Sequence, residues 1–225
     1  MSTDNDGQKI KELHDYCIQN GFREESFLSQ DNLDRYIETS IDAYRNYPMF
    51  LYVFNGGYDK EALTRMLRVD FKCRMNKMLG ISNGDYESII LVEPPKAKRT
   101  GLMQYIKAAD RKSYSLLLNE ATYRQDVFEK YALKKRKPYL DERTWYIYIF
   151  ATKKSLQRMG YGKKLMKAVL GFASANGYRL CLETNASENV AMYQRFGFTL
   201  KDSTVFKNRI WHYVMVYDGK EVNPG

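Results

Sequence analysis

One short turn constrains the fold of this chain more than any other feature. Segment 157–162 carries Gly160 and Gly162, and it lies between an apolar run, 145–152, and an amphipathic run, 165–173. This order predicts a strand, a turn and a helix. Because glycine has no Cβ, backbone N–H groups there can approach an anion closely, and the positive end of the helix dipole points at the same place. The turn is therefore suited to binding a diphosphate.

Two other phosphate-binding turns are incomplete in this segment. A mononucleotide P-loop needs Lys-Ser or Lys-Thr after its last glycine, whereas Gly162 is followed by Lys163 and Lys164. A dinucleotide fingerprint needs three glycines and, about 20 residues later, an acidic residue. Glu183 stands 21 positions after Gly162, but the first glycine of the triplet is missing. Neither class of nucleotide site is predicted.

A third type of turn fits in full. Segment 157–162 resembles the Q/R-x-x-G-x-G/A turn of the GNAT superfamily of N-acetyltransferases at every fixed position. Segment 182–198 resembles the strand, helix and Gly-Phe turn that follow in the same family, with Asn189 and Tyr193 in the matching places. Two motifs in the right order and at the right separation are more specific than either motif alone.

The resemblance varies along the chain. It is close over residues 144–217 and loose over residues 33–95. Residues 145–146 and 182–184 are similar to the branch of the superfamily that contains puromycin N-acetyltransferase. That branch often has a histidine just before its Trp-Tyr pair, whereas this chain has Thr144. The difference argues against a proton relay through a histidine at that place.

The resemblance implies both a fold and a cosubstrate. The fold is mixed α/β, with a mostly antiparallel central sheet and helices on both faces. The cosubstrate is acetyl-coenzyme A (acetyl-CoA), with its pantetheine arm along the central strand and its diphosphate at the glycine turn. One backbone N–H of that strand would also polarise the thioester carbonyl. The residues implied to bind acetyl-CoA are Phe150, Ala151, Thr152, Gln157, Arg158, Met159, Gly160, Tyr161, Gly162, Lys163 and Asn189.

Acetyl transfer to an amine also needs an acid for the departing thiolate. Tyr193 matches the family's tyrosine that faces the coenzyme sulfur, and a phenol with a pKa of about 10 is protonated at neutral pH. Tyr193 is therefore the predicted general acid, and the alternative is a core tyrosine that anchors a short helix. Asn189, four residues earlier, is expected on the same helical face, where it contacts the coenzyme or caps the helix.

The general base is less clearly marked. Many family members carry a glutamate on the central strand where this chain has Tyr146, and no carboxylate lies within 145–152. Glu183 is the candidate base, because a carboxylate on an apolar strand should be partly desolvated and have a raised pKa. A structural glutamate bonded to Asn185 or to the backbone is equally consistent with the sequence. A water chain ending at Tyr146 would serve as well.

The acceptor pocket is predicted to be lined by aromatic residues. Candidate acceptor-binding residues are Trp145, Tyr146 and Tyr47, although aromatic residues are equally good core residues. The expected acceptor is a primary amine of a small molecule. A protein lysine or an N-terminal amine is an open alternative, because fold analogy does not settle a substrate. So is a regulatory protein that binds acetyl-CoA without turnover.

Composition excludes several classes of protein. The net charge of +9 suits the coenzyme phosphates, and it equally suits nucleic acid, so a nucleic-acid-binding protein is the rival hypothesis, against which stands the lack of a stacking-module pattern. Three cysteines without C-x-x-C spacing and two histidines predict a reduced, metal-free, cytoplasmic protein. No apolar run approaches the roughly 18 residues of a membrane span. A monomer and a homodimer are both consistent with the sequence.

The expected organisation is a single acetyltransferase domain over residues 31–219. Residues 1–30 form an N-terminal helical extension that packs on it, with a mobile tail as the alternative, and residues 220–225 form a C-terminal tail. The predicted strands span 88–92, 145–152, 178–184, 198–205 and 211–217. A helix from Asp59 is expected to end at Gly80, and 101–131 is irregularly helical. The basic run 134–137 is expected to be a solvated loop rather than a nuclear import signal.

Overall fold

A six-stranded mixed sheet forms the centre of the protein. The computed structural model describes residues 3–98, 100–109 and 119–219. The strands lie in the order β1-β2-β3-β4-β6-β5, and each neighbouring pair is antiparallel except β3 and β4. The predicted mixed, mostly antiparallel sheet is therefore confirmed. The strands are β1 Leu79–Ser82, β2 Ser88–Glu93, β3 Thr144–Thr152, β4 Arg179–Thr184, β5 Thr199–Phe206 and β6 Ile210–Tyr217.

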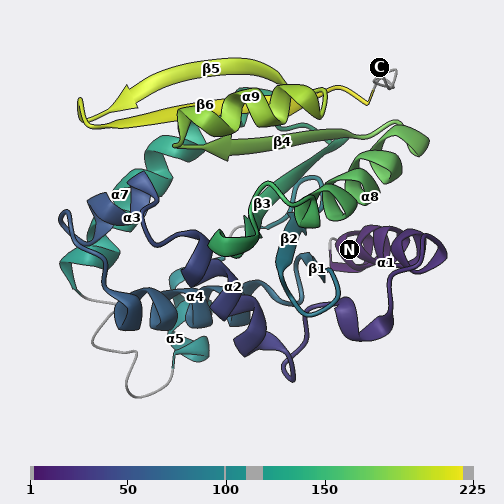
Figure 1. Cartoon of the computed structure of the whole chain (residues 1–225), viewed down its shortest axis with the longest axis horizontal. Coiled ribbons are helices and arrows are strands. Elements are labelled where there is room, and N and C mark those ends of the chain that lie inside the picture. The colour runs from purple at the N-terminus through teal and green to yellow at the C-terminus, as the bar shows by residue number, and fades with distance from the viewer. Residues whose placement is uncertain (1–2, 99, 110–118, 220–225) are drawn as a thin grey trace.

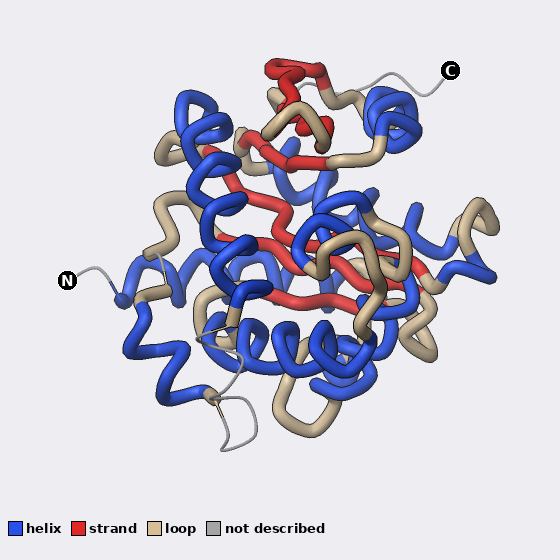
Figure 2. The backbone as a smooth tube through the Cα atoms, turned by 90° about the vertical axis from the view of Figure 1, so that its left-hand side faces the viewer, coloured by secondary structure: helices blue, strands red, loops and turns tan. Residues whose placement is uncertain are grey.

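Helices cover both faces of this sheet (Figure 1). Buried residues of α1 and α8 share a core with one face, and those of α2 and α4 share a core with the other. Figure 2 shows the strands running between these helices. The helices are α1 Thr3–Gln19, α2 Leu33–Ala43, α3 Pro48–Val53, α4 Lys60–Arg74, α5 Leu102–Ala108, α7 Glu120–Arg136, α8 Tyr161–Ala175 and α9 Ser187–Arg195, with short 3₁₀ turns at Glu24–Ser26, Lys137–Tyr139 and Lys154–Leu156.

The N-terminal helix is part of the core. Leu13 and Cys17 of α1 are fully buried, in the same cluster as Leu165 and Phe172 of α8. The helix thus packs against α8 on one face of the sheet. Across the described ranges, no helix combines the length and the apolar character that crossing a membrane requires.

A bulge in β3 decides which of its side chains face which core. Val92 of β2 pairs with Ile147, and Leu91 pairs with Ile149, so Tyr148 is an extra residue on β3. One extra residue shifts the alternation of side chains by one position. Accordingly, Ile147 is buried in the cluster with α8, and Ile149 is buried in the cluster with α2 and α4.

Strands β3 and β4 pair along only part of their length. Four residues of each strand are paired, and the last pair is Ile147 with Leu182, although β3 continues to Thr152 and β4 to Thr184. Beyond Ile147, β3 pairs with β2 alone among the described strands. The edge of β3 that faces β4 therefore presents backbone N–H and C=O groups to a space rather than to a strand.

Two boundaries differ from the sequence-based expectation. The predicted helix end at Gly80 is wrong, because α4 ends at Arg74 and Gly80 lies in β1, a strand that the sequence analysis missed. A Cβ at Gly80 would lie 2.6 Å from the Cβ of Leu28, so this glycine permits close packing rather than a helix end. The stretch 101–131 contains α5 and the first part of α7, while residues 110–118 and the tail 220–225 lie outside the described residues.

Candidate active site

The glycine turn joins the end of β3 to the start of α8. Arg158 and Gly160 both have left-handed backbone conformations, with φ of 65° and 87°. Gly160 is the N-cap of α8, and no side chain caps this helix by a hydrogen bond. The N–H groups of the first helical turn consequently have no side-chain acceptor, and the positive end of the helix dipole lies at the same place. This is the local geometry that suits an anion.

Gly162 is required by close packing against β3. A Cβ at this position would lie 2.7 Å from Cζ of Phe150 and 3.2 Å from Oγ1 of Thr152. The side-chain amide of Gln157 donates to the Thr152 carbonyl at 3.2 Å and so folds the turn back onto the strand. The helix start, the turn and the end of β3 therefore form one closely packed unit. Lys163, beyond the turn, is exposed.

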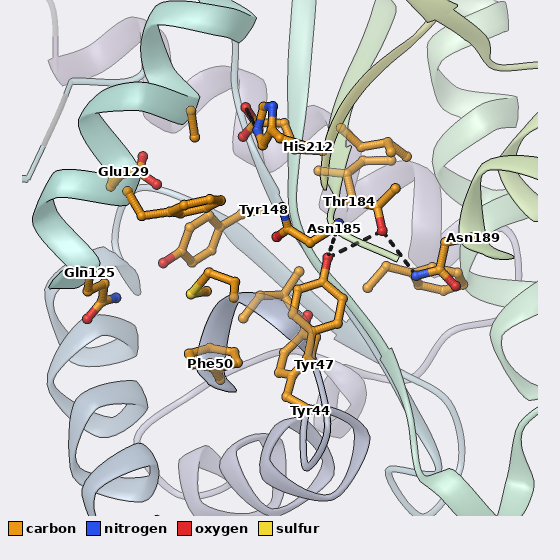
Figure 3. A pocket seen from close by; sticks show the side chains of 18 of the residues that line it. Tyr44, Tyr47, Phe50, Gln125, Glu129, Tyr148, Thr184, Asn185, Asn189 and His212 are labelled. Carbon is orange, nitrogen blue, oxygen red and sulfur yellow. Dashed lines mark hydrogen bonds and ion pairs between the residues drawn. The ribbon is translucent and has the colours of Figure 1, made fainter. Parts of the chain in front are cut away.

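A cavity of about 140 Å³ lies between the diverging strands and the helices beside them. Figure 3 shows Gln125 and Glu129 reaching in from α7, and Thr184, Asn185 and Asn189 on the opposite side. Tyrosines and other aromatic residues form much of the wall. The residues that line the cavity include Tyr44, Tyr47, Met49, Phe50, Asp70, Phe128, Glu129, Tyr146, Tyr148, Phe150, Glu183, Thr184, Asn185, Asn189, Tyr193 and His212.

Tyr193 lies at the end of the cavity nearest the glycine turn. Its ring centroid is 6.3 Å from that of Phe150, the residue that also packs beneath Gly162. Only 5% of Tyr193 is exposed, and burial raises the pKa of its phenol. The hydroxyl has no hydrogen-bond partner in the part of the chain that the structure describes. The hydroxyl proton of Tyr193 is therefore not engaged in a hydrogen bond to any described residue.

Tyr47, Thr184 and Asn189 form a hydrogen-bonded group in the cavity (Figure 3). The backbone N–H of Asn185 donates to the hydroxyl of Tyr47 at 2.8 Å, and that hydroxyl lies 3.3 Å from Oγ1 of Thr184. The side-chain amide of Asn189 donates to the same Thr184 oxygen at 3.1 Å. Tyr47 and Asn189, predicted from the sequence for different tasks, are thus joined through Thr184.

Glu183 is the centre of a second, buried network. Its Oε2 accepts from the Tyr146 hydroxyl at 2.7 Å and from Arg136 at 2.9 Å, and its Oε1 lies 3.0 Å from Nε2 of His212. Burial raises the pKa of Glu183, but the hydrogen bond with His212 and the charge of Arg136 outweigh it and hold the pKa below its ordinary value. The prediction of a raised pKa is therefore wrong, since apolar flanks in the sequence do not reveal these partners.

The basic run 134–137 contains one buried member. Arg136 is 8% exposed and bonds both Glu183 and Glu129, while Lys134 is exposed and Lys135 lies 3.5 Å from Asp202. The run ends α7 rather than forming a loop. The expectation of a solvated loop is thus wrong in two respects. The run is helical rather than a loop, and Arg136 is buried rather than solvated.

Acid should remove the contribution of Glu183 to stability. Its pKa is lower in the folded protein than the ordinary value of 4.5, so the unfolded chain takes up a proton first and stability falls as pH drops below that value. Thermal unfolding of wild type and Glu183→Gln as a function of pH would test this. The difference in stability should be full at neutral pH and shrink through the acidic range. A difference that stays constant would contradict the prediction.

The structure brings part of the predicted set of residues together in the cavity. Tyr146, Glu183, Asn189 and Tyr193 line one cavity. Trp145 does not line the cavity. It is fully buried in the cluster with α8, where its ring centroid lies 5.5 Å from that of Phe172. Its proposed contact with the acceptor is therefore not retained.

Three residues of the site were not found from the sequence. His212 is one of only two histidines and lies in an apolar strand, a signal that could have identified it. Arg136 was hidden in a basic run, and Glu129 lies on a helix without a clear apolar stripe. No group of three or more metal-binding side chains occurs within the described residues.

Comparisons with known proteins agree with this arrangement. Residues 139–218 match the model of the Acetyltransferase (GNAT) domain family. A curated relative, an uncharacterised N-acetyltransferase of Schizosaccharomyces pombe, is 23% identical over 176 residues, which cover 73% of this chain and 70% of that protein.

Solved structures show the same fold. A structure described as histone acetyltransferase HPA2 and related acetyltransferase, from Corynebacterium glutamicum, has a TM-score of 0.56 at 17% identity, covering 88% of this chain and 98% of that one. Arylalkylamine N-acetyltransferase 2 from Aedes aegypti has a TM-score of 0.55 at 13% identity, covering 86% and 98%. Residues 139–218, which include the glycine turn and Tyr193, match a GNAT acetyltransferase domain, and together with the relative this match identifies the protein as an N-acetyltransferase enzyme.

Proposed function

We propose that this enzyme transfers the acetyl group of acetyl-CoA to a primary amine of a small-molecule acceptor. The observation that carries the proposal is the position of Phe150. Its side chain packs beneath Gly162 in the anion-binding turn and also lies beside Tyr193 in the cavity. A cosubstrate with its diphosphate at the turn and its arm along the free edge of β3 would thus present its thioester to the cavity.

The residues proposed to hold acetyl-CoA lie on three consecutive parts of the chain. The backbone of 150–152 would bond the pantetheine arm, and the amides of 157–163 would bond the diphosphate. Lys163, on the exposed first turn of α8, adds positive charge near these phosphates. Asn189 faces Thr184 and would contact the arm from α9.

The reaction proposed is a direct transfer. The amine nitrogen attacks the thioester carbonyl carbon, a C–N bond forms, and the C–S bond breaks. The Tyr193 phenol gives its proton to the departing thiolate, and the proton that the amine loses returns to solvent or to a base. Positioning of the two reactants can supply about 7–11 kcal/mol of the barrier, so the cleft between β3 and β4 contributes more than any one proton carrier.

Glu183 is proposed as that base, acting through Tyr146. The Tyr146 hydroxyl donates to Glu183, so it can take a proton from the amine while passing its own proton to the carboxylate. Because the pKa of Glu183 is lowered, its carboxylate is ionised at neutral pH and can accept that proton. This relay replaces the strand carboxylate that many relatives use.

Three narrower proposals go with this function. The chain is proposed to belong to the branch of puromycin N-acetyltransferase, because residues 145–146 and 182–184 resemble that branch. It is proposed to act in the cytoplasm as a monomer or homodimer. It is also proposed to need neither a metal nor a nucleic acid, and its positive charge to serve the coenzyme phosphates.

Calorimetry and a thiol assay test the proposal together. Acetyl-CoA should bind with measurable heat, and free thiol should appear only when a primary amine is added. Gly162→Ala should weaken acetyl-CoA binding about tenfold or more, because its Cβ would meet Phe150 at 2.7 Å and displace the turn or the strand edge. Gly57→Ala is the control, since its Cβ would meet only a carbonyl at 3.8 Å.

Two outcomes would contradict the proposal. If wild type gives no heat with acetyl-CoA, the coenzyme site is not at the turn or elsewhere on this protein. If Gly162→Ala binds acetyl-CoA as tightly as Gly57→Ala does, the diphosphate is not held by the head of α8.

A further inference from the structure

The cavity differs in charge from the rest of the molecule. The chain has a net charge of +9, yet the cavity is lined by three carboxylates, Asp70, Glu129 and Glu183, and by no lysine or arginine among the described residues. Arg74 and Arg136 lie directly behind these carboxylates and offset two of the three negative charges, so the wall keeps one net negative charge. Such a wall attracts a cationic molecule and repels an anionic one.

Two of the three carboxylates are already bonded through both of their oxygens. Asp70 accepts from Tyr148 at 2.6 Å, from Arg74 at 2.8 Å and from Tyr105 at 3.1 Å. Glu183 has three partners as well. A new cation would therefore have to share an oxygen that already has a partner.

Glu129 is different. Its Oε1 accepts from Arg136, while its Oε2 has no hydrogen-bond partner in the described part of the chain. The side chain is 38% exposed and reaches from α7 into the cavity (Figure 3). One carboxylate oxygen in this aromatic space is thus available to a ligand.

Glu129 lies across the cavity from Tyr193, where the thioester is proposed to end, and Arg136 joins it to Glu183, the proposed base. Figure 3 places Glu129 opposite Asn189, and Tyr193 lies one helical turn beyond Asn189 on α9. An amine must also be neutral to attack a thioester, and a carboxylate beside it would stabilise the unreactive ammonium form. Glu129 therefore suits a second cationic group at the far end of the acceptor.

The space between these two ends is mostly apolar. Met49, Phe50 and Phe128 line it, and a cavity of about 140 Å³ suits a slim chain rather than a bulky ring system. Aromatic faces also tolerate an ammonium group that passes them. A run of methylene groups would bury its apolar surface here without leaving a polar group unpaired.

We infer that the acceptor is a short aliphatic diamine, with Glu129 binding the ammonium group that does not react. This inference rests on the proposed acetyl transfer and names the class of molecule that enters the same site. Glu129 is thereby a specificity-determining residue rather than a catalytic one.

Matched substrates and matched variants test the inference. With acetyl-CoA present, thiol release would be measured for 1,5-diaminopentane and for pentylamine, which has the same chain but no second ammonium group. Wild type should have a kcat/KM at least about tenfold higher for the diamine, the usual effect of one charged hydrogen bond. In Glu129→Gln the ratio should fall to near one. Glu120→Gln, on the same helix but outside the cavity, should keep the wild-type ratio.

The ratio separates a specific contact from a general loss. Glu129→Gln also weakens a bond to Arg136, but a change in packing would affect both amines equally and leave the ratio unchanged. Equal use of the two amines by wild type, or an unchanged ratio in Glu129→Gln, would overturn the inference while leaving acetyl transfer intact.

A binding measurement covers failure of the proposed function itself. If no amine releases thiol, the diamine should still raise the melting temperature of wild type more than pentylamine does, and Glu129→Gln should lose that difference. Equal shifts for the two amines would overturn the inference independently of turnover.

Discussion

Replacing Arg136 with methionine should lower the free energy of unfolding by about 3–5 kcal/mol, the usual cost of removing one partner of a buried ion pair. Methionine keeps most of the buried stem but removes the charge. Glu183, whose side chain is 11% exposed, would then face Glu129 without a cation between them. Chemical denaturation at neutral pH would measure the loss.

Two comparisons make this prediction specific. Lys134→Met changes an exposed member of the same basic run and should alter stability by no more than about 0.5 kcal/mol. Adding Glu183→Gln to Arg136→Met should restore part of the loss, because one uncompensated carboxylate is removed. A loss below about 1 kcal/mol in Arg136→Met would mean that the network is hydrated and contributes little.

Replacing Tyr193 with phenylalanine should lower kcat about 10²-fold, which is the low end of the effect of one general acid. The substitution removes a single oxygen from a ring that stays packed against Phe150 and Phe198. Because burial raises the pKa of Tyr193, the wild-type phenol stays protonated throughout the neutral range. The affinity for acetyl-CoA should change little, since the backbone rather than this hydroxyl holds the coenzyme.

Tyr44→Phe is the matched control for this variant. Tyr44 lines the same cavity, and its hydroxyl makes no hydrogen bond that would be lost within the described residues. Steady-state kinetics with saturating acetyl-CoA should show near wild-type turnover for Tyr44→Phe. If Tyr193→Phe is equally active, Tyr193 is not the acid and the thiolate is protonated by water.

The sequence predicted the coenzyme side of the site better than the acceptor side. Gly160 and Gly162 are informative because backbone geometry at a turn depends on residues that are adjacent in the chain. Strand β3 and helix α8 on either side follow from local apolar patterns. These elements therefore place the turn without any knowledge of distant contacts.

The acceptor side depends on contacts between distant residues. Arg136 and Glu183 are 47 positions apart, and their pairing reverses the expected shift in the pKa of the carboxyl. The bulge at Tyr148 puts Ile149 on the opposite face of the sheet from Ile147. Neither feature leaves a local pattern in the sequence.

The short pairing of β3 with β4 divides the sheet mechanically. Strands β1 to β3 form one half and β4 to β6 the other, and four parallel pairs are the strand contacts that join them. A cosubstrate bound along the unpaired part of β3 would contact both halves and connect them. Occupancy of the cleft would then stiffen the molecule, because the ligand would join the two halves along the part of β3 that β4 leaves unpaired.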